Sequence, residues 1–171
     1  MRLAISSSGV DKGKMLPAHV IEVDETGKAL VGSRRPSAET LLHLAILRNT
    51  HAGAVLHTHS VWSTMLSDLH ARDSGLAIEG LEMLKGLEGV SSHGHREWVP
   101  ILENSQNMPE LANIVERALK EHPRLHGFLL RGHGLYTWGE NLSQAKRHVE
   151  ILEFLLEVTG RSLSLSERGS E

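Results

Sequence analysis

Ala54-Val55-Leu56-His57-Thr58-His59-Ser60 is an apolar run that ends in two histidines separated by one residue. If the run is a β-strand, alternate side chains share one face of the sheet. His57 and His59 then project the same way and lie close enough to bind one metal ion. Spacing alone leaves a second interpretation open, because two of 12 histidines could equally be surface residues or hydrogen-bonded core residues.

The composition is that of a soluble protein with one domain. A chain of 171 residues can bury a core without disulfides or a structural metal, and its apolar content of 40% is ordinary. A net charge of −3 without a long basic run argues against nucleic acid or a membrane surface as a partner. We find no signal peptide, and no apolar run approaches the roughly 20 residues that span a bilayer. We therefore expect a cytoplasmic protein.

Cysteine is absent from the sequence. This excludes disulfides, thiol nucleophiles and thiolate metal ligands. A transition-metal site in this chain must therefore use imidazole and carboxylate groups, which suit zinc, iron, manganese or nickel.

The pattern of apolar residues and breakers predicts interleaved strands and helices. We expect strands over residues 2–5, 19–24, 28–31, 54–57, 98–102, 127–130 and 135–138, and helices over 38–49, 61–70, 143–159 and from 109 onward. The segment 75–89 is a mixture of turns and a short helix, and Pro100 indicates an edge strand or a bulge. Several strands have hairpin-length connections, so we predict a three-layer α/β/α fold with a central, largely antiparallel sheet. This single domain covers residues 1–160, and a polar, flexible tail follows over 161–171.

His133 strengthens the metal interpretation. It stands between Gly132 and Gly134 at the end of another apolar strand, and the glycines permit a bend that regular strand geometry refuses. Three neutral imidazoles leave the charge of a bound ion available to a fourth ligand. Zinc in such an open site polarises a carbonyl group or lowers the pKa of bound water.

A second His-x-His pair, His93 and His95, competes for this role. It lies in the polar stretch of residues 91–97, which includes Arg96 and Glu97, and has no apolar strand ahead of it. A solvated surface turn is the simpler interpretation of this pair.

Two carboxylates and one polar loop complete the candidate residues. Glu82 is a charge inside an apolar, glycine-bracketed segment, and Glu39 lies near a helix start, where an acid also favours the helix dipole. Either is a general acid/base if burial raises its pKa. For an anionic group, the Ser6–Gly9 loop with Lys12, and Ser37 at a helix start, supply hydroxyls, N–H donors and positive charge.

Three motifs are specific in combination: Arg35-Pro36-Ser37-Ala38-Glu39-Thr40, the opening stretch, and Gly132-His133-Gly134-Leu135-Tyr136-Thr137-Trp138-Gly139. Together they resemble the class II aldolase/adducin family, over nearly the whole chain. Within that family, residues 7–13, 81–86 and 147–155 resemble its sugar-phosphate dehydratases.

The resemblance implies a site and an assembly. It implies one zinc ion per subunit held by His57, His59 and His133, with Glu82 as the catalytic acid/base. In related aldolases the carboxylate that matches Glu39 takes that part, which makes Glu39 the second choice. It also implies a homotetramer with active sites near subunit interfaces. The residues expected to hold a substrate phosphate are Ser8, Gly9, Lys12 and Ser37.

The resemblance also implies a difference, because members of that family usually carry a further N-terminal helix and strand with a Gly-Asn phosphate loop, ahead of the point that matches Leu3. We expect the chain to lack this segment, together with its core packing and its phosphate contacts.

The resulting functional hypothesis is zinc-dependent dehydration of a 2-keto sugar phosphate. The metal polarises the C2 carbonyl, Glu82 removes the C3 proton, and the C4 hydroxyl leaves as water. Two alternatives remain. An aldolase would break the C3–C4 bond with the same early chemistry, and a truncated scaffold would keep the fold without turnover.

Overall fold

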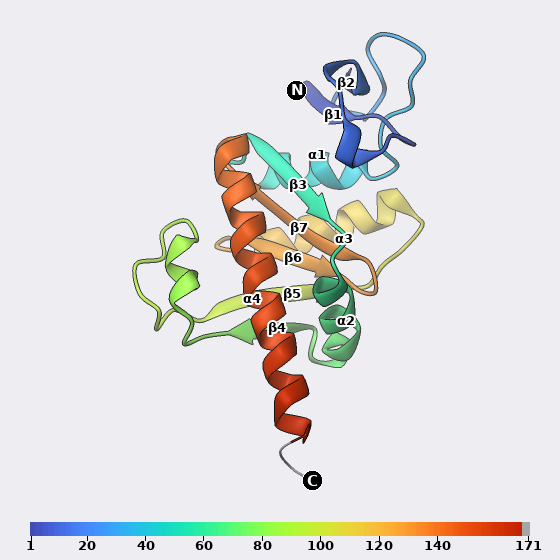
Figure 1. The fold of residues 1–171 in the computed structure, drawn as a ribbon. Helices are drawn as coiled ribbons and strands as arrows, with labels where there is room; N and C mark the ends of the chain where they lie inside the picture. Colours follow the sequence, from blue (N-terminus) through green and yellow to red (C-terminus); the bar gives the residue numbers. More distant parts are fainter. Residues whose placement is uncertain (169–171) are drawn as a thin grey trace.

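The computed structural model describes residues 1–168 (Figure 1). The strands are β1 (Leu3–Ser6), β2 (Val20–Val23), β3 (Ala54–Thr58), β4 (Gly75–Ile78), β5 (Glu97–Leu102), β6 (Gly127–Leu130) and β7 (Gly134–Gly139). The α-helices are α1 (Thr40–Asn49), α2 (Val61–Leu69), α3 (Met108–Glu121) and α4 (Leu142–Arg168). Short 3-10 helices are η1 (Lys12–Lys14), η2 (Pro17–His19), η3 (Ala71–Asp73) and η4 (Glu82–Gly86).

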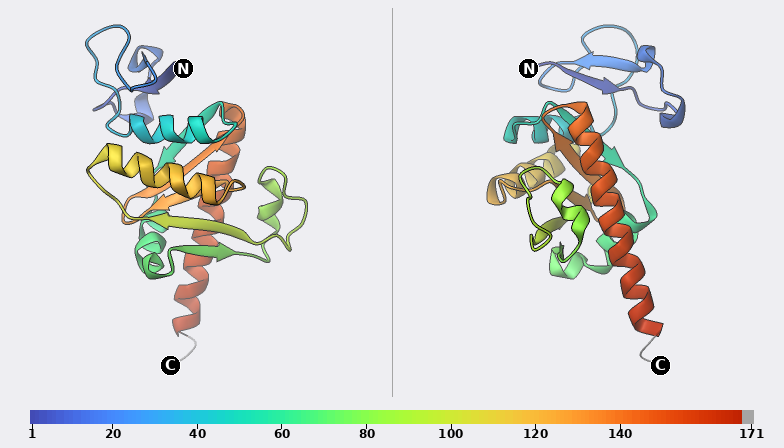
Figure 2. Two further views of the ribbon diagram at one scale, coloured as in Figure 1. Left: turned by 180° about the vertical axis from the view of Figure 1, so that it is seen from behind. Right: turned by 60° about the vertical axis from the view of Figure 1, so that its left-hand side comes forward.

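The main sheet has five strands in the order β3-β7-β6-β5-β4. Only β5 and β6 pair in parallel, and the other neighbours pair antiparallel. Helices α1 and α3 cover one face and α2 and α4 cover the other (Figure 2). This confirms the predicted three-layer α/β/α fold with a largely antiparallel sheet. Strands β1 and β2 form a separate two-stranded sheet.

Alternation along β6 and β7 divides the core into two layers. Phe128, Leu130 and Tyr136 pack with α1 and α3, whereas Leu129 and Leu135 pack with α4. All five are fully buried. Each such side chain stabilises the fold by roughly 1.5–3 kcal/mol relative to an exposed position. The same alternation places His57 on the α1 side of the sheet, because His57 pairs directly with Tyr136 and shares its face.

Three secondary-structure predictions were wrong. Strand β4 lies within the segment expected to hold only turns and a short helix. It forms because it pairs with β5, and four residues are too few to show a strand pattern in the sequence. Strand β5 lies between β4 and β6 and is no edge strand. Pro100 is tolerated because the ladder with β6 begins only at Ile101. The strand expected over 28–31 is reduced to one bridge between Val23 and Ala29.

The last helix is longer than its apolar pattern. It was expected to end at Thr159 and continues to Arg168, so most of the predicted tail is helical. Residues 169–171 of that tail lie outside the described residues. Among the helices of residues 1–168, none is long and apolar enough to cross a membrane.

A buried carboxylate anchors the end of the sheet where β5 begins. The Glu97 side chain is 3% exposed, and both of its oxygens lie 3.0 Å from His126 Nδ1. His126 Nε2 lies 2.8 Å from the Glu88 carbonyl oxygen, and His95 Nε2 lies 2.8 Å from Glu97 Oε2. Since both ring nitrogens of His126 face acceptors, His126 donates from both and is an imidazolium. The pair ties the loop after η4 to the sheet.

Candidate metal centre

The end of β3 presents two histidines on the α1 face of the sheet. His57 is the fourth residue of β3, and its Nδ1 lies 2.8 Å from the Leu135 carbonyl oxygen on β7. A carbonyl only accepts, so Nδ1 carries the hydrogen and Nε2 offers a lone pair. His59 follows the strand, and Ser60 then caps α2 by accepting from the Ser63 N–H at 3.0 Å.

A tight turn between β6 and β7 supplies the third histidine. Gly132 has φ of 62°, a conformation that favours glycine. At Gly134 an added Cβ would lie 2.0 Å from the Thr58 carbonyl oxygen, so a side chain there would push β3 away. Two hydroxyls of α2 fix the turn: Ser67 accepts from the Gly132 N–H at 3.0 Å, and Thr64 donates to the His133 carbonyl at 3.1 Å.

Glu39 reaches the site from the start of α1. It occupies the N-cap position, and its N–H donates to the Ser37 hydroxyl oxygen at 3.3 Å. The Ser37 N–H in turn donates to the Ser6 carbonyl at the end of β1, at 3.2 Å. The carboxylate is therefore held by a turn that is itself tied to the two-stranded sheet of β1 and β2.

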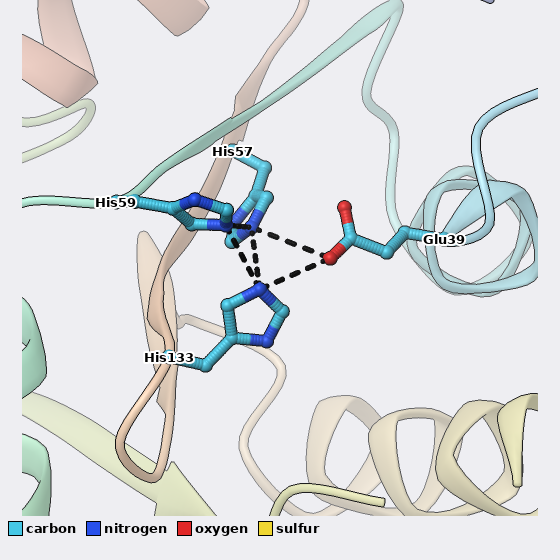
Figure 3. A group of neighbouring side chains, drawn as sticks. All are labelled: Glu39, His57, His59 and His133. Atoms are coloured by element: carbon cyan, nitrogen blue, oxygen red, sulfur yellow. Dashed lines mark hydrogen bonds and ion pairs between the residues drawn. The ribbon is translucent and has the colours of Figure 1, made fainter. Parts of the chain in front are cut away.

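The four side chains converge on one point (Figure 3). His57 Nε2 lies 2.7 Å from His59 Nε2 and 3.3 Å from His133 Nε2, and the last two atoms are 2.8 Å apart. Glu39 Oε1 lies 3.1 Å from His133 Nε2 and 3.6 Å from His57 Nε2. All four ligand atoms lie within 4.8 Å of one another.

This donor set fits a divalent metal ion. Ligand bonds of about 2.0–2.1 Å in a tetrahedral zinc site place the ligand atoms about 3.3–3.4 Å apart. The five separations given above, from 2.7 to 3.6 Å, span that value, and all four atoms lie within 4.8 Å. Three imidazoles and a carboxylate are also suitable ligands for iron and manganese.

His57 and His133 are held in the neutral form that binds metal. Burial lowers the pKa of His57 to about 3, and the neighbouring His133 and His59 also lower it, against its hydrogen bond to Leu135. Burial also lowers the pKa of His133, against the charge of Glu39. At neutral pH both rings keep a lone pair for a ligand bond.

Glu82 does not join the cluster of its own chain. It begins η4, its side chain is 71% exposed, and it pairs with Lys85 and, at 3.8 Å, with His93. Its hydrogen bond and ion pair with Lys85 lower its pKa, so the burial and raised pKa that would make Glu82 a general acid/base are not present in the single chain. Figures 1 and 2 show η4 beyond the opposite end of the strands from the end of β3.

His93 and His95 do not form a second metal cluster. In the part of the chain that the structure describes, one group of candidate ligands converges, and it contains neither residue. His95 is nevertheless not a simple surface histidine, because it is hydrogen-bonded to the buried Glu97.

The candidate phosphate residues lie in two adjoining loops. The Lys12 ammonium donates to the Ser6 hydroxyl at 2.8 Å, and the N–H of Ser8 donates to the Arg35 carbonyl at 2.9 Å. The N–H groups of Ser8 and Ser37 are thus used inside the protein. Any contact of these two serines with an anion would come from their hydroxyls. An added Cβ at Gly9 would meet nothing within 4 Å, so the surroundings of this residue are open.

Comparisons with known proteins agree with this geometry. Residues 1–159 match the family model described as Class II Aldolase and Adducin N-terminal domain. The methylthioribulose-1-phosphate dehydratase of Methylococcus capsulatus is 44% identical over 161 residues, which cover 94% of this chain and 78% of that protein. The enzyme of that name from Pseudomonas aeruginosa is 44% identical over 166 residues, with coverages of 96% and 80%.

Solved structures show the same fold. An L-fuculose 1-phosphate aldolase superposes with a TM-score of 0.77 at 22% identity and covers 96% of this chain and 71% of its own. The L-fuculose-1-phosphate aldolase from Thermus thermophilus gives a TM-score of 0.74 at 26% identity, with coverages of 97% and 85%.

Proposed function

Because the chain belongs to the class II aldolase and adducin family, we propose that it is a zinc-dependent methylthioribulose-1-phosphate dehydratase of methionine salvage. The reaction converts 5-methylthioribulose 1-phosphate to 5-methylthio-2,3-diketopentyl 1-phosphate and water. The observation that carries the proposal is the convergence of His57, His59, His133 and Glu39. The names of relatives 44% identical over most of the chain supply the substrate.

The three histidines would hold one zinc ion per subunit, with Glu39 as a fourth ligand in the absence of substrate. A bound zinc ion supplies a Lewis acid that polarises the ketone and stabilises negative charge on its oxygen. The hydrogen bond from His57 to Leu135 keeps that ring in the tautomer this role requires.

Dehydration requires one carboxylate to remove the C3 proton and an acid to protonate the departing C4 hydroxyl. The C3–H and C4–O bonds break, water leaves, and the remaining enol tautomerises to the 2,3-diketone. Glu39 is the carboxylate that the same chain supplies at the cluster, so we assign the C3 proton to it. Glu82 would reach a site only from a neighbouring subunit, where it would protonate the leaving hydroxyl.

Substrate phosphate would bind beside Ser37, at the loops of Ser8, Gly9 and Lys12. The Lys12 ammonium supplies positive charge, and the hydroxyls and Gly9 supply donors. The Ser37 turn would then connect the phosphate end of the substrate to Glu39.

We propose a cytoplasmic homotetramer. The absence of cysteine is compatible with a reducing cytoplasm, and one exposed apolar stripe supports contact between subunits. Val61, Met65 and Leu69 recur every four residues along α2 and are 69%, 56% and 65% exposed. Exposed apolar stripes of this kind mark contact surfaces, and this one begins two residues after His59. A neighbouring subunit seated there would lie beside the site.

The decisive experiment is a product assay on the purified, zinc-loaded chain with 5-methylthioribulose 1-phosphate. The proposal expects a diketone and water. An aldehyde product would instead make the chain an aldolase, the function that the names of its structural neighbours favour. A zinc-loaded chain that yields neither product would support the non-catalytic scaffold.

A mixed-subunit experiment tests Glu82. We expect Glu82→Gln and His57→Ala homo-oligomers each to lose most turnover. If Glu82 acts in a neighbouring site, co-expressed chains in equal amounts regain activity. Random mixing places an intact metal site beside an intact Glu82 in about one quarter of cases, and this sets the expected recovery.

Glu79→Gln, which alters another exposed carboxylate near η4, serves as the matched control and should leave turnover unchanged. No recovery in the mixture would exclude action between subunits.

A further inference from the structure

Tyr136 is held rigidly against the metal centre. It lies on β7, is fully buried, and stacks on His57 with ring centroids 4.0 Å apart and planes 17° apart. Phe128 covers its other side at 5.1 Å, and His43 of α1 meets it edge-on at 5.8 Å. The ring has no room to swing, so the position of its hydroxyl is fixed.

The hydroxyl of Tyr136 makes no hydrogen bond of normal geometry among the described residues. A buried, unpaired hydroxyl destabilises a protein, whereas phenylalanine would keep the same stacking without that cost. Folding therefore gives no reason for the oxygen atom. A buried polar atom of this kind calls for a partner in another state of the site.

The Glu39 carboxylate is the acceptor that the site offers. The phenol and Glu39 both contact His57: the two rings stack at 4.0 Å, and Glu39 Oε1 lies 3.6 Å from His57 Nε2. In keeping with this arrangement, burial raises the pKa of Tyr136 and the neighbouring Glu39 raises it further. Glu39 Oε1 is directed at the histidines, while Figure 3 shows its second oxygen turned away from them. The carboxylate thus has an oxygen without a partner in the cluster.

We propose that the Tyr136 hydroxyl is a positioning donor for Glu39, engaged when substrate displaces that carboxylate from the histidines. The inference rests on the proposed role of Glu39 as the base for the C3 proton. The hydrogen bond fixes the orientation of the carboxylate during proton transfer. Because the phenol is packed between two rings, it donates without an ordering cost at the moment of reaction.

The Tyr136→Phe variant tests the proposal. A hydrogen bond to a charged group corresponds to a change of about 10- to 100-fold in rate, so we expect kcat to fall by that factor. KM and the zinc content should stay within about twofold, since the ring and the histidines are unchanged. The metal-free variant should melt at the same temperature as the parent or about 2–4 °C higher, because an unpaired hydroxyl has been removed.

Thr137→Val is the matched control. This neighbouring residue on β7 is also fully buried, but its hydroxyl donates to the His126 carbonyl at 2.6 Å. Its removal should lower the melting temperature and leave kcat unchanged. If Tyr136→Phe also lowers the melting temperature of the metal-free protein, the hydroxyl is structural and the proposal is overturned.

Coupling to Glu39 separates this inference from the proposed function. The effect of Tyr136→Phe on kcat should vanish in a Glu39→Gln background, because the acceptor charge is gone. Equal losses in both backgrounds would overturn the proposal. The comparison applies whether the product is a diketone or an aldehyde, so an unexpected product would refute the dehydratase assignment without deciding the role of Tyr136.

Discussion

Replacing His57 with alanine is expected to abolish stoichiometric zinc binding and to slow turnover by at least about 10³-fold. His57 supplies one of three nitrogen ligands, and its Nε2 lies within 3.3 Å of the other two. The variant would keep two histidines and Glu39 but lose the ring whose orientation a hydrogen bond to the Leu135 carbonyl fixes. Metal analysis of the purified variant and the product assay measure the two effects.

A thermal measurement separates loss of metal from loss of fold. Zinc should raise the melting temperature of the parent chain, because a ligand that binds only the folded state stabilises it. The His57→Ala variant should fold but show no such rise. His51→Ala removes an exposed histidine three residues before β3 and should behave as the parent does. Full turnover with stoichiometric zinc in the His57 variant would refute the proposed centre.

The Glu97→Gln variant is expected to lose about 3 kcal/mol of unfolding free energy, because it leaves a buried imidazolium without its counter-charge. For a chain of this size that corresponds to a fall in melting temperature of roughly 6–12 °C. Calorimetry of the metal-free protein measures it. Glu103→Gln is the matched control, because Glu103 is 68% exposed in its ion pair with Arg131 and should matter by less than about 1 kcal/mol.

The effect of Glu97 should depend on pH. Burial opposes the charge on His126, but Glu97 and the Glu88 carbonyl outweigh it and raise the pKa of His126. Burial likewise opposes the charge on Glu97, but His126 and His95 outweigh it and lower the pKa of that carboxyl. His148 of α4 also faces the pair, with its ring centroid 5.5 Å from that of His126.

The direction of each pKa shift decides how the stability from this pair depends on pH. The raised pKa of His126 in the folded state stabilises the protein. This stabilisation is complete below the unfolded pKa of 6.5 and disappears as the pH rises through the folded pKa. The lowered pKa of Glu97 stabilises the protein above the unfolded pKa of 4.5, and this stabilisation disappears as the pH falls through the folded pKa. The difference between parent and Glu97→Gln should therefore be largest between about pH 5 and pH 6.5. A difference that stays constant up to pH 9 would contradict this account.

The sequence predicted the part of the centre that is local. Strand parity placed His57 and His59 together, and the glycines around His133 indicated the bend that brings in the third ring. Glu39 was the second choice because the resemblance to the dehydratases implies Glu82, and because a helix start already explains an acid at this position. Only the fold shows that this particular helix start faces the end of β3.

Non-local contacts were beyond the sequence. Glu97 and His126 are 29 positions apart, and no pattern in either segment predicts that they form a buried pair. The apolar neighbours of Glu82 suggested burial, but Leu84 points into the core from η4 while Glu82 points outward. In a short 3-10 turn, adjacent residues face different surroundings, so the character of neighbours says little about one side chain.

The hydroxyls of Thr64 and Ser67 on α2 hold the turn that carries His133, and the same helix exposes the apolar stripe beside the site. If a neighbouring subunit covers that stripe, metal uptake and subunit association act on one helix. They are then thermodynamically linked: whatever factor assembly adds to the affinity for metal, metal adds to the affinity between subunits. Dilution would release zinc, and chelation would loosen the assembly.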